Sequence, residues 1–234
     1  LLQIVYYFFA ALKLGAPSRT VSFSVPTGNF GDIYAGYLAK CMGLPIDRLV
    51  VATNKNDILH RFISRNEYSM TVLNKTYSPS MDILVSSNFE RYLFDLFGRD
   101  SKELCQFMDS FGKGSLSVGE DQWEQVKTCF DSSSVDDETT CKVIRELFNE
   151  KGKLLDPHTA VGLQSARNCA RDSKSPMVTL ATAHPAKFSD AILAAGLAEP
   201  ELPPHLQDLF SREERYSVVP NELSAVVDFI KSRV

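Results

Sequence analysis

The feature that most constrains the fold is the segment 24–32, in which a short apolar strand runs into a helix through a turn that contains two glycines. Residues 21–25 are typical of a buried strand, and residues 33–40 are typical of a helix. Glycines let a ligand approach the backbone, and the N–H groups at a helix N-terminus point toward an anion. The glycine spacing matches neither the dinucleotide fingerprint nor a P-loop. The sequence therefore predicts either an anion-binding turn or a plain helix entry.

Strands and helices alternate around this turn, which is typical of an α/β protein. Residues 49–53 are uncharged and rich in β-branched side chains, so we expect a strand buried on both faces of a parallel sheet. A third strand is predicted over 176–181. Open parallel sheets bind ligands at the carboxyl ends of their strands. Three groups of residues fall at such ends and predict a single site: 28–32, 53–54 and 182–184.

The middle of the chain differs in character. Over residues 98–152 charge and serine content rise, strand signals are absent, and the apolar spacing predicts three amphipathic helices. We therefore expect an α/β part over 1–97, a helical insertion over 98–152, and over 153–234 the remainder of the same α/β domain with a C-terminal helix.

Composition narrows the class of protein. The net charge of −4, without a basic patch, argues against a nucleic-acid partner. No apolar run reaches about 18 residues, so no membrane-spanning helix is predicted. The five cysteines are widely spaced and form no C-x-x-C pair, so neither a metal site nor a disulfide framework is indicated. We expect reduced thiols and a cytoplasmic protein.

Several motifs resemble one enzyme family. Residues 25–32 resemble the phosphate loop of threonine synthase, a pyridoxal 5′-phosphate-dependent enzyme of fold type II. Further segments resemble the same family, in the same order along the chain: 42–46, 52–59, 78–84, 86–91, 156–162 and 182–188. The resemblance implies a three-layer α/β fold, with an open, mostly parallel sheet between helices.

The resemblance also implies a cofactor site. It assigns the cofactor phosphate to the residues Thr27, Gly28, Asn29, Phe30, Gly31 and Asp32. Asp32 carries the same sign of charge as the phosphate, so we interpret it first as a residue that caps the helix or tightens the turn. Thr182 is implied to face the pyridine nitrogen of the cofactor, with a helix N-cap as the alternative.

Other polar residues are further candidates for the site or for structural roles. Asn88 and Arg91 are possible contacts of the substrate or the cofactor, although Glu90 and Arg91 could equally form a surface pair. We interpret His158 and His184 as structural, because a lone histidine at a helix start is more often a satisfied structural residue than an acid or base. Asp156 and Thr159 are interpreted first as caps of the helix that begins near Pro157.

One part of the family pattern is missing from the sequence. The Schiff-base lysine of the family, in a Phe-Lys-Asp context, does not occur, nor does its Ser-Gly-Asp-Thr-Gly stretch. Residues 1–12 resemble a segment that lies in the middle of the family's chains, after that lysine. We therefore expect this sequence to be the C-terminal portion of a longer enzyme, with no catalytic residue of its own, inactive by itself and completed by the upstream half.

The implied function is that of threonine synthase. This enzyme is a carbon–oxygen lyase of threonine biosynthesis that converts O-phospho-L-homoserine and water to L-threonine and phosphate by β,γ-elimination and replacement. One alternative is a threonine-synthase-like phospholyase that releases 2-oxobutyrate. Another is a truncated, non-catalytic interaction protein that could be secreted.

Overall fold

The computed structural model describes residues 2–111, 114–171 and 174–234. The chain divides into two compact units, Leu1–Pro200 and Glu201–Val234. The division into 1–97, 98–152 and 153–234 stays a prediction.

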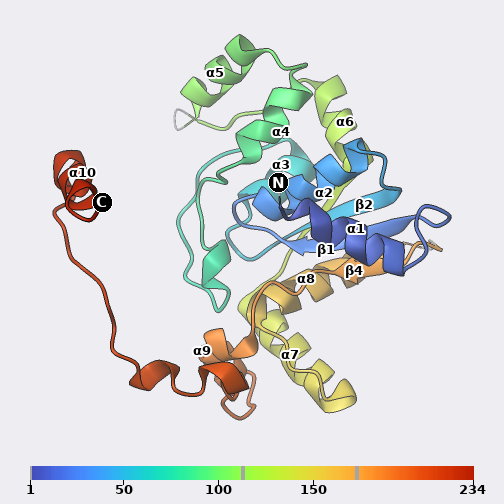
Figure 1. Cartoon of the computed structure of the whole chain (residues 1–234). Helices are drawn as coiled ribbons and strands as arrows, with labels where there is room; N and C mark the ends of the chain where they lie inside the picture. The colour runs from blue at the N-terminus through green and yellow to red at the C-terminus, as the bar shows by residue number, and fades with distance from the viewer. Residues whose placement is uncertain (1, 112–113, 172–173) are drawn as a thin grey trace. The chain divides into compact units, whose positions relative to one another are not determined.

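The first unit is built on a parallel sheet (Figure 1). Within the described residues the sheet has four strands in the order β3-β2-β1-β4, and each neighbouring pair is parallel. The strands are β1 (Val21–Pro26), β2 (Ile46–Thr53), β3 (Phe130–Ser134) and β4 (Met177–Thr179). All four carboxyl ends therefore lie at the same edge, which is where the sequence predicts a site.

Helices cover both faces of this sheet. The helices of the first unit are α1 (Ile4–Lys13), α2 (Gly31–Cys41), α3 (Ile58–Arg65), α4 (Phe89–Leu96), α5 (Ser101–Ser110), α6 (Glu120–Cys129), α7 (Asp137–Lys151), α8 (Pro157–Asn168) and α9 (Ser189–Ala194), with short 3-10 turns η1 (Pro79–Met81) and η2 (Pro185–Lys187). In Figure 1, α8 lies on one side of the sheet and α2 on the other. The predicted α/β fold with helices on both faces is confirmed.

Alternate residues of β1 explain these layers, because successive side chains of a strand point to opposite faces. Phe23 packs on Tyr7 of α1, with ring centroids 4.9 Å apart. Ser24 points the other way, and its hydroxyl donates to the carbonyl oxygen of Gly162 in α8 over 2.6 Å. A Cβ at Gly162 would lie 3.1 Å from Cγ of Pro26, so the glycine permits close packing of α8 on β1.

The middle region contains one element that the sequence did not predict. Helices α5, α6 and α7 match the expectation, but residues 130–134 form strand β3, which pairs with β2. This strand is rich in serine and has no β-branched residue, and Phe130 is its one residue of a type enriched in strands. Tertiary contacts stabilise it instead: Phe130 is 1% exposed, and the hydroxyl of Ser134 donates to the carbonyl oxygen of Asn54 over 2.8 Å.

The second unit contains the predicted C-terminal helix. It consists of η3 (Pro204–Leu206), η4 (Leu209–Ser211) and α10 (Leu223–Lys231). In the first unit, the 3-10 turn η2 and the helix α9 are separated at Phe188, where φ is −136° and ψ is 54°. None of the helices in the described part of the chain is long and apolar enough to cross a membrane.

Candidate functional site

The turn between β1 and α2 is fixed by the side chain of Phe30. This residue is the N-cap of α2 and has a φ of 59°, in the left-handed region that costs a non-glycine residue about 1–2 kcal/mol. Its ring is 1% exposed and packs on Phe89 and Phe130, with centroid distances of 5.1 and 5.7 Å. Burial of the ring therefore offsets the backbone strain and holds the turn in one conformation.

Two side chains hold the carbonyl groups of this turn. The hydroxyl of Ser86 donates to the carbonyl oxygen of Gly28 over 2.7 Å, and Nδ2 of Asn88 donates to that of Asn29 over 2.9 Å. In a trans peptide the C=O and the following N–H point in opposite directions. The N–H groups of Asn29 and Phe30 therefore point away from Ser86 and Asn88.

The N–H groups of the turn have few acceptors of their own. Thr27 N–H donates to the carbonyl oxygen of Ala52 over 2.7 Å. Among the hydrogen bonds that join residues of the described ranges, none uses the N–H groups of residues 28–32. These groups lead directly into the N-terminus of α2, where the helix dipole favours a negative charge. The arrangement can therefore bind an anion through the main chain.

The two glycines of the turn have different surroundings. A Cβ at Gly28 would lie 3.0 Å from the carbonyl oxygen of Ser80 and 3.2 Å from Cα of Met81, both backbone atoms of η1. A Cβ at Gly31 would lie 3.5 Å from Nδ2 of Asn88, an ordinary contact. Gly28 is therefore needed for the close approach of η1, whereas Gly31 leaves room for a methyl group.

A cavity of about 480 Å³ lies at the first turn of α2, and residues 27–31 are not among those that line it. Its lining joins α1, the first turn of α2 and the residues after β4: Gln3, Tyr6, Asp32, Leu180, Ala181 and Thr182. The cavity brings two of the predicted site residues, Asp32 and Thr182, to one space at the carboxyl edge of the sheet. Its volume is in the range of small-molecule sites.

Asp32 and Thr27 form hydrogen bonds within the chain. The hydroxyl of Tyr7 donates to the main-chain oxygen of Asp32 over 2.9 Å and to its Oδ1 over 3.2 Å. Burial raises the pKa of the Asp32 carboxyl, and the hydrogen bond from Tyr7 lowers it in part. The Thr27 hydroxyl is buried and donates to the carbonyl oxygen of Val25 over 2.6 Å, which closes the turn from inside.

Asn54, at the end of β2, is placed differently from the expectation. The sequence predicts that Asn54 shares one site with residues 28–32 and 182–184, but Asn54 is not among the residues that line the cavity. Its Nδ2 donates to Oδ1 of Asp82 and to Oγ1 of Thr76, each over 2.8 Å, and its Oδ1 accepts from Asn56 N–H over 2.9 Å. Asn54 therefore anchors the segment around η1, which in turn packs against Gly28.

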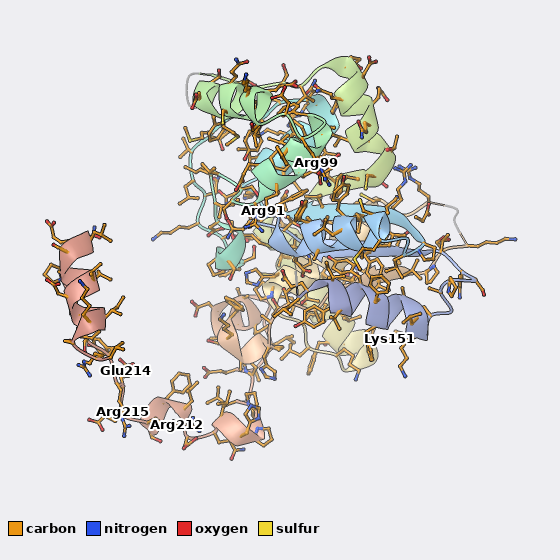
Figure 2. The ribbon with its side chains drawn as sticks, turned by 45° about the horizontal axis from the view of Figure 1, so that its top comes forward. Arg91, Arg99, Lys151, Arg212, Glu214 and Arg215 are labelled. Atoms are coloured by element: carbon orange, nitrogen blue, oxygen red, sulfur yellow. The ribbon has the colours of Figure 1, made fainter. Side chains whose placement is uncertain are left out.

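The remaining candidates have separate surroundings. Asn88 holds the turn through its amide, as described above. Arg91 lies on α4 with an exposed side chain (Figure 2). Ser86 and Tyr7 contact the site and were not singled out from the sequence. Ser86 is the first residue of the family-like segment 86–91, and this resemblance was the only indication in the sequence that it belongs to the site.

The first turn of α8 satisfies its own polar groups. Asp156 caps the helix, as predicted, by accepting from the N–H groups of His158 and Thr159 over 3.0 and 3.4 Å. The His158 Nε2 accepts from Ser80 N–H over 3.2 Å, so its Nδ1 carries a proton and donates to Asp156 over 2.9 Å. His184 caps η2 by accepting from Ala186 N–H over 3.2 Å. Both histidines thus have the structural environment that the sequence predicts.

Solved structures define the class of this fold. The chain superposes on a PLP-bound threonine synthase from Brucella melitensis with a TM-score of 0.92 at 48% identity, over 98% of this chain and 50% of that one. It superposes on the threonine synthase from yeast with a TM-score of 0.86 at 35% identity, again over 98% of this chain and 50% of the other. The fold is that of the fold-type-II class of pyridoxal-phosphate enzymes.

The sequence comparisons identify the family within this class. Residues 159–230 match the family described as "Threonine synthase, C-terminal". The chain is 58% identical to the threonine synthase of Pseudomonas aeruginosa, over 97% of this chain and 49% of that protein. The chain belongs to the threonine synthase family, and it spans about half the length of the curated relatives it matches.

Proposed function

We propose that this chain supplies the phosphate-binding part of a threonine synthase that uses pyridoxal 5′-phosphate. The observation that carries the proposal is the turn before α2. Its carbonyl groups are held by Ser86 and Asn88, and its N–H groups at 28–32 have no acceptor within the described residues. A phosphate dianion supplies the acceptors that such a group of amides lacks.

The surrounding residues fit this group. The amides of Gly28, Asn29, Phe30 and Gly31 would hold the phosphate, and Thr27 keeps the turn closed from inside. Oδ1 of Asp32 accepts a hydrogen bond from the hydroxyl of Tyr7 over 3.2 Å, which fixes the first turn of α2 against α1. We therefore assign Asp32 to the support of the turn rather than to direct contact with the anion.

Thr182 is the proposed partner of the pyridine nitrogen. It lines the same cavity as Asp32 and is exposed, so its side chain is accessible to a ligand there. A neutral hydroxyl cannot hold that nitrogen protonated as an aspartate would, so the phosphate and the other ring substituents would have to contribute more. When bound, the cofactor stabilises negative charge on the substrate carbons next to it.

The proposed reaction converts O-phospho-L-homoserine and water to L-threonine and phosphate. This chain binds and orients the cofactor through the turn and Thr182, while Asn88 holds the turn and Arg91 stays a candidate contact for the substrate. We expect the lysine that moves protons at the substrate carbons in the half of the relatives' length that this chain does not cover. We expect the completed enzyme in the cytoplasm.

The test is product analysis of the natural full-length polypeptide that contains this sequence. Incubation with O-phospho-L-homoserine and pyridoxal 5′-phosphate should release L-threonine and inorganic phosphate in equal amounts. If 2-oxobutyrate is the only organic product, the phospholyase alternative is correct. If the cofactor binds and neither product forms, the proposed function is wrong.

A further inference from the structure

A buried carboxylate at the start of α8 has more hydrogen bonds than helix capping requires. Asp156 is 1% exposed, and the adjoining His158 and Thr159 are 3% and 4% exposed. Its Oδ1 accepts the two capping N–H groups and Nδ1 of His158, while its Oδ2 accepts from the Thr159 hydroxyl. Both capping N–H groups use Oδ1, so the contact of Oδ2 with Thr159 is additional to the cap.

The first branch of this network leads to Thr182. The hydroxyl of Thr159 has a single proton, and it donates that proton to Oδ2 of Asp156. Its lone pairs are then left to accept from Thr182 N–H, which lies 3.3 Å from Oγ1 of Thr159. The Asp156 carboxylate therefore sets the orientation of the hydroxyl that holds the backbone of Thr182.

The second branch leads to the glycine turn. His158 donates to Asp156 and accepts from Ser80 N–H over 3.2 Å, and its ring packs on Phe188 with the centroids 4.4 Å apart. Ser80 belongs to η1, and its carbonyl oxygen lies 3.0 Å from the point where a Cβ of Gly28 would be. The same carboxylate thus holds the backbone segment that supports the turn.

We propose that Asp156 is a positioning residue that sets the spacing between the two ends of the cofactor site. It holds Thr182 through Thr159, and it holds the glycine turn through His158 and Ser80. The inference deepens the proposed function and rests on it for the identity of the ligand. The hydrogen-bond network itself consists only of residues of this chain and can be tested without the ligand.

The charge state of Asp156 suits this role. Burial alone would raise the pKa of its carboxyl, but hydrogen bonds from His158 and Thr159 outweigh burial and hold the pKa below its usual value. The group is therefore an ionised, acceptor-only carboxylate at neutral pH. An asparagine would keep Oδ1 for the capping N–H groups but would put a donor where Oδ2 accepts.

The first experiment is amide hydrogen exchange of Ser80 and Thr182 in the full-length polypeptide that contains this sequence. Thr159→Val keeps the branched shape and removes the acceptor, so exchange at Thr182 should rise about fivefold or more while Ser80 is unchanged. His158→Phe should produce the opposite pattern, and Asp156→Asn should accelerate exchange at both amides. Thr159→Ser is the matched control, because it retains the hydroxyl and should leave Thr182 protected.

The second experiment measures the dissociation constant of pyridoxal 5′-phosphate in the full-length polypeptide. Asp156→Asn should weaken binding about tenfold, the loss expected for a hydrogen bond to a charged group, and Thr159→Ser should bind like the wild type. Equal exchange at Thr182 in Thr159→Val and Thr159→Ser would overturn the inference, whatever the enzyme binds. If Asp156→Asn does not fold, the two single-branch variants decide. A failure of product formation with the exchange pattern intact would instead overturn the proposed function.

Discussion

The most quantitative prediction concerns the contact between Gly28 and η1. In Gly28→Ala the added methyl carbon would lie 3.0 Å from the carbonyl oxygen of Ser80 and 3.2 Å from Cα of Met81, closer than ordinary van der Waals contact. Both atoms belong to the backbone, and Ser80 N–H is held by His158 over 3.2 Å, so η1 cannot move freely. Overpacking of this kind costs about 1–3 kcal/mol. For a chain of this size each kcal/mol lowers Tm by roughly 2–4 °C, which predicts a decrease of about 2–12 °C.

The assay is thermal unfolding of the chain followed by circular dichroism, with Gly31→Ala as the matched control. The new Cβ of that variant would lie 3.5 Å from Nδ2 of Asn88, so its Tm should stay within about 2 °C of the wild type. If Gly28→Ala and Gly31→Ala unfold at the same temperature, the close approach of η1 to the turn does not exist in solution. The explanation of Gly28 would then be wrong.

Three further predictions follow from the same contacts. Ser86→Ala removes the donor to the carbonyl oxygen of Gly28 and should weaken the binding of pyridoxal 5′-phosphate about fivefold, measured by fluorescence titration, whereas Ser87→Ala, at an exposed neighbour, should not. Burial raises the folded-state pKa of Asp32, so its contribution to stability is present below the unfolded pKa and is lost as pH rises through the folded pKa. The variant Asp32→Asn does not have this pH-dependent loss. In urea titrations, its free energy of unfolding at pH 7, taken relative to that at pH 3, should therefore be higher than in the wild type. The folded-state pKa of Asp156 is depressed. Its contribution to the free energy of unfolding is therefore present above the unfolded pKa of about 3.9 and is lost as pH falls below it. In Asp156→Asn, the free energy of unfolding should fall less between pH 7 and pH 3 than in the wild type.

Much of the fold could be predicted from local patterns. The apolar segment before Gly28 and the helix after Gly31 are confirmed as β1 and α2. The Asp-Pro start of α8 was predictable as well, because aspartate caps a helix and proline suits its first position. These features depend on residues that are close in sequence.

The parts that could not be predicted depend on distant contacts. Strand β3 is serine-rich and is a strand because it pairs with β2 and buries Phe130. The role of Asn54 could not be derived from its place after a strand, because its partners Thr76 and Asp82 come from an irregular segment more than 20 residues away. Ser86 lies in a segment that resembles the family, but its contact could not be derived from its neighbours, because its acceptor, the carbonyl oxygen of Gly28, is 58 positions away.

The central claim is that the amides of the turn bind the phosphate of the cofactor. The most direct measurement is the amide spectrum of the full-length polypeptide, with 15N-labelled glycine and phenylalanine, titrated with pyridoxal 5′-phosphate and, as a control, with pyridoxal. We predict that the resonances of Gly28, Phe30 and Gly31 shift with the phosphorylated compound and stay in place with pyridoxal. If these three resonances do not move while the cofactor saturates the protein, the phosphate is bound elsewhere and the account is contradicted.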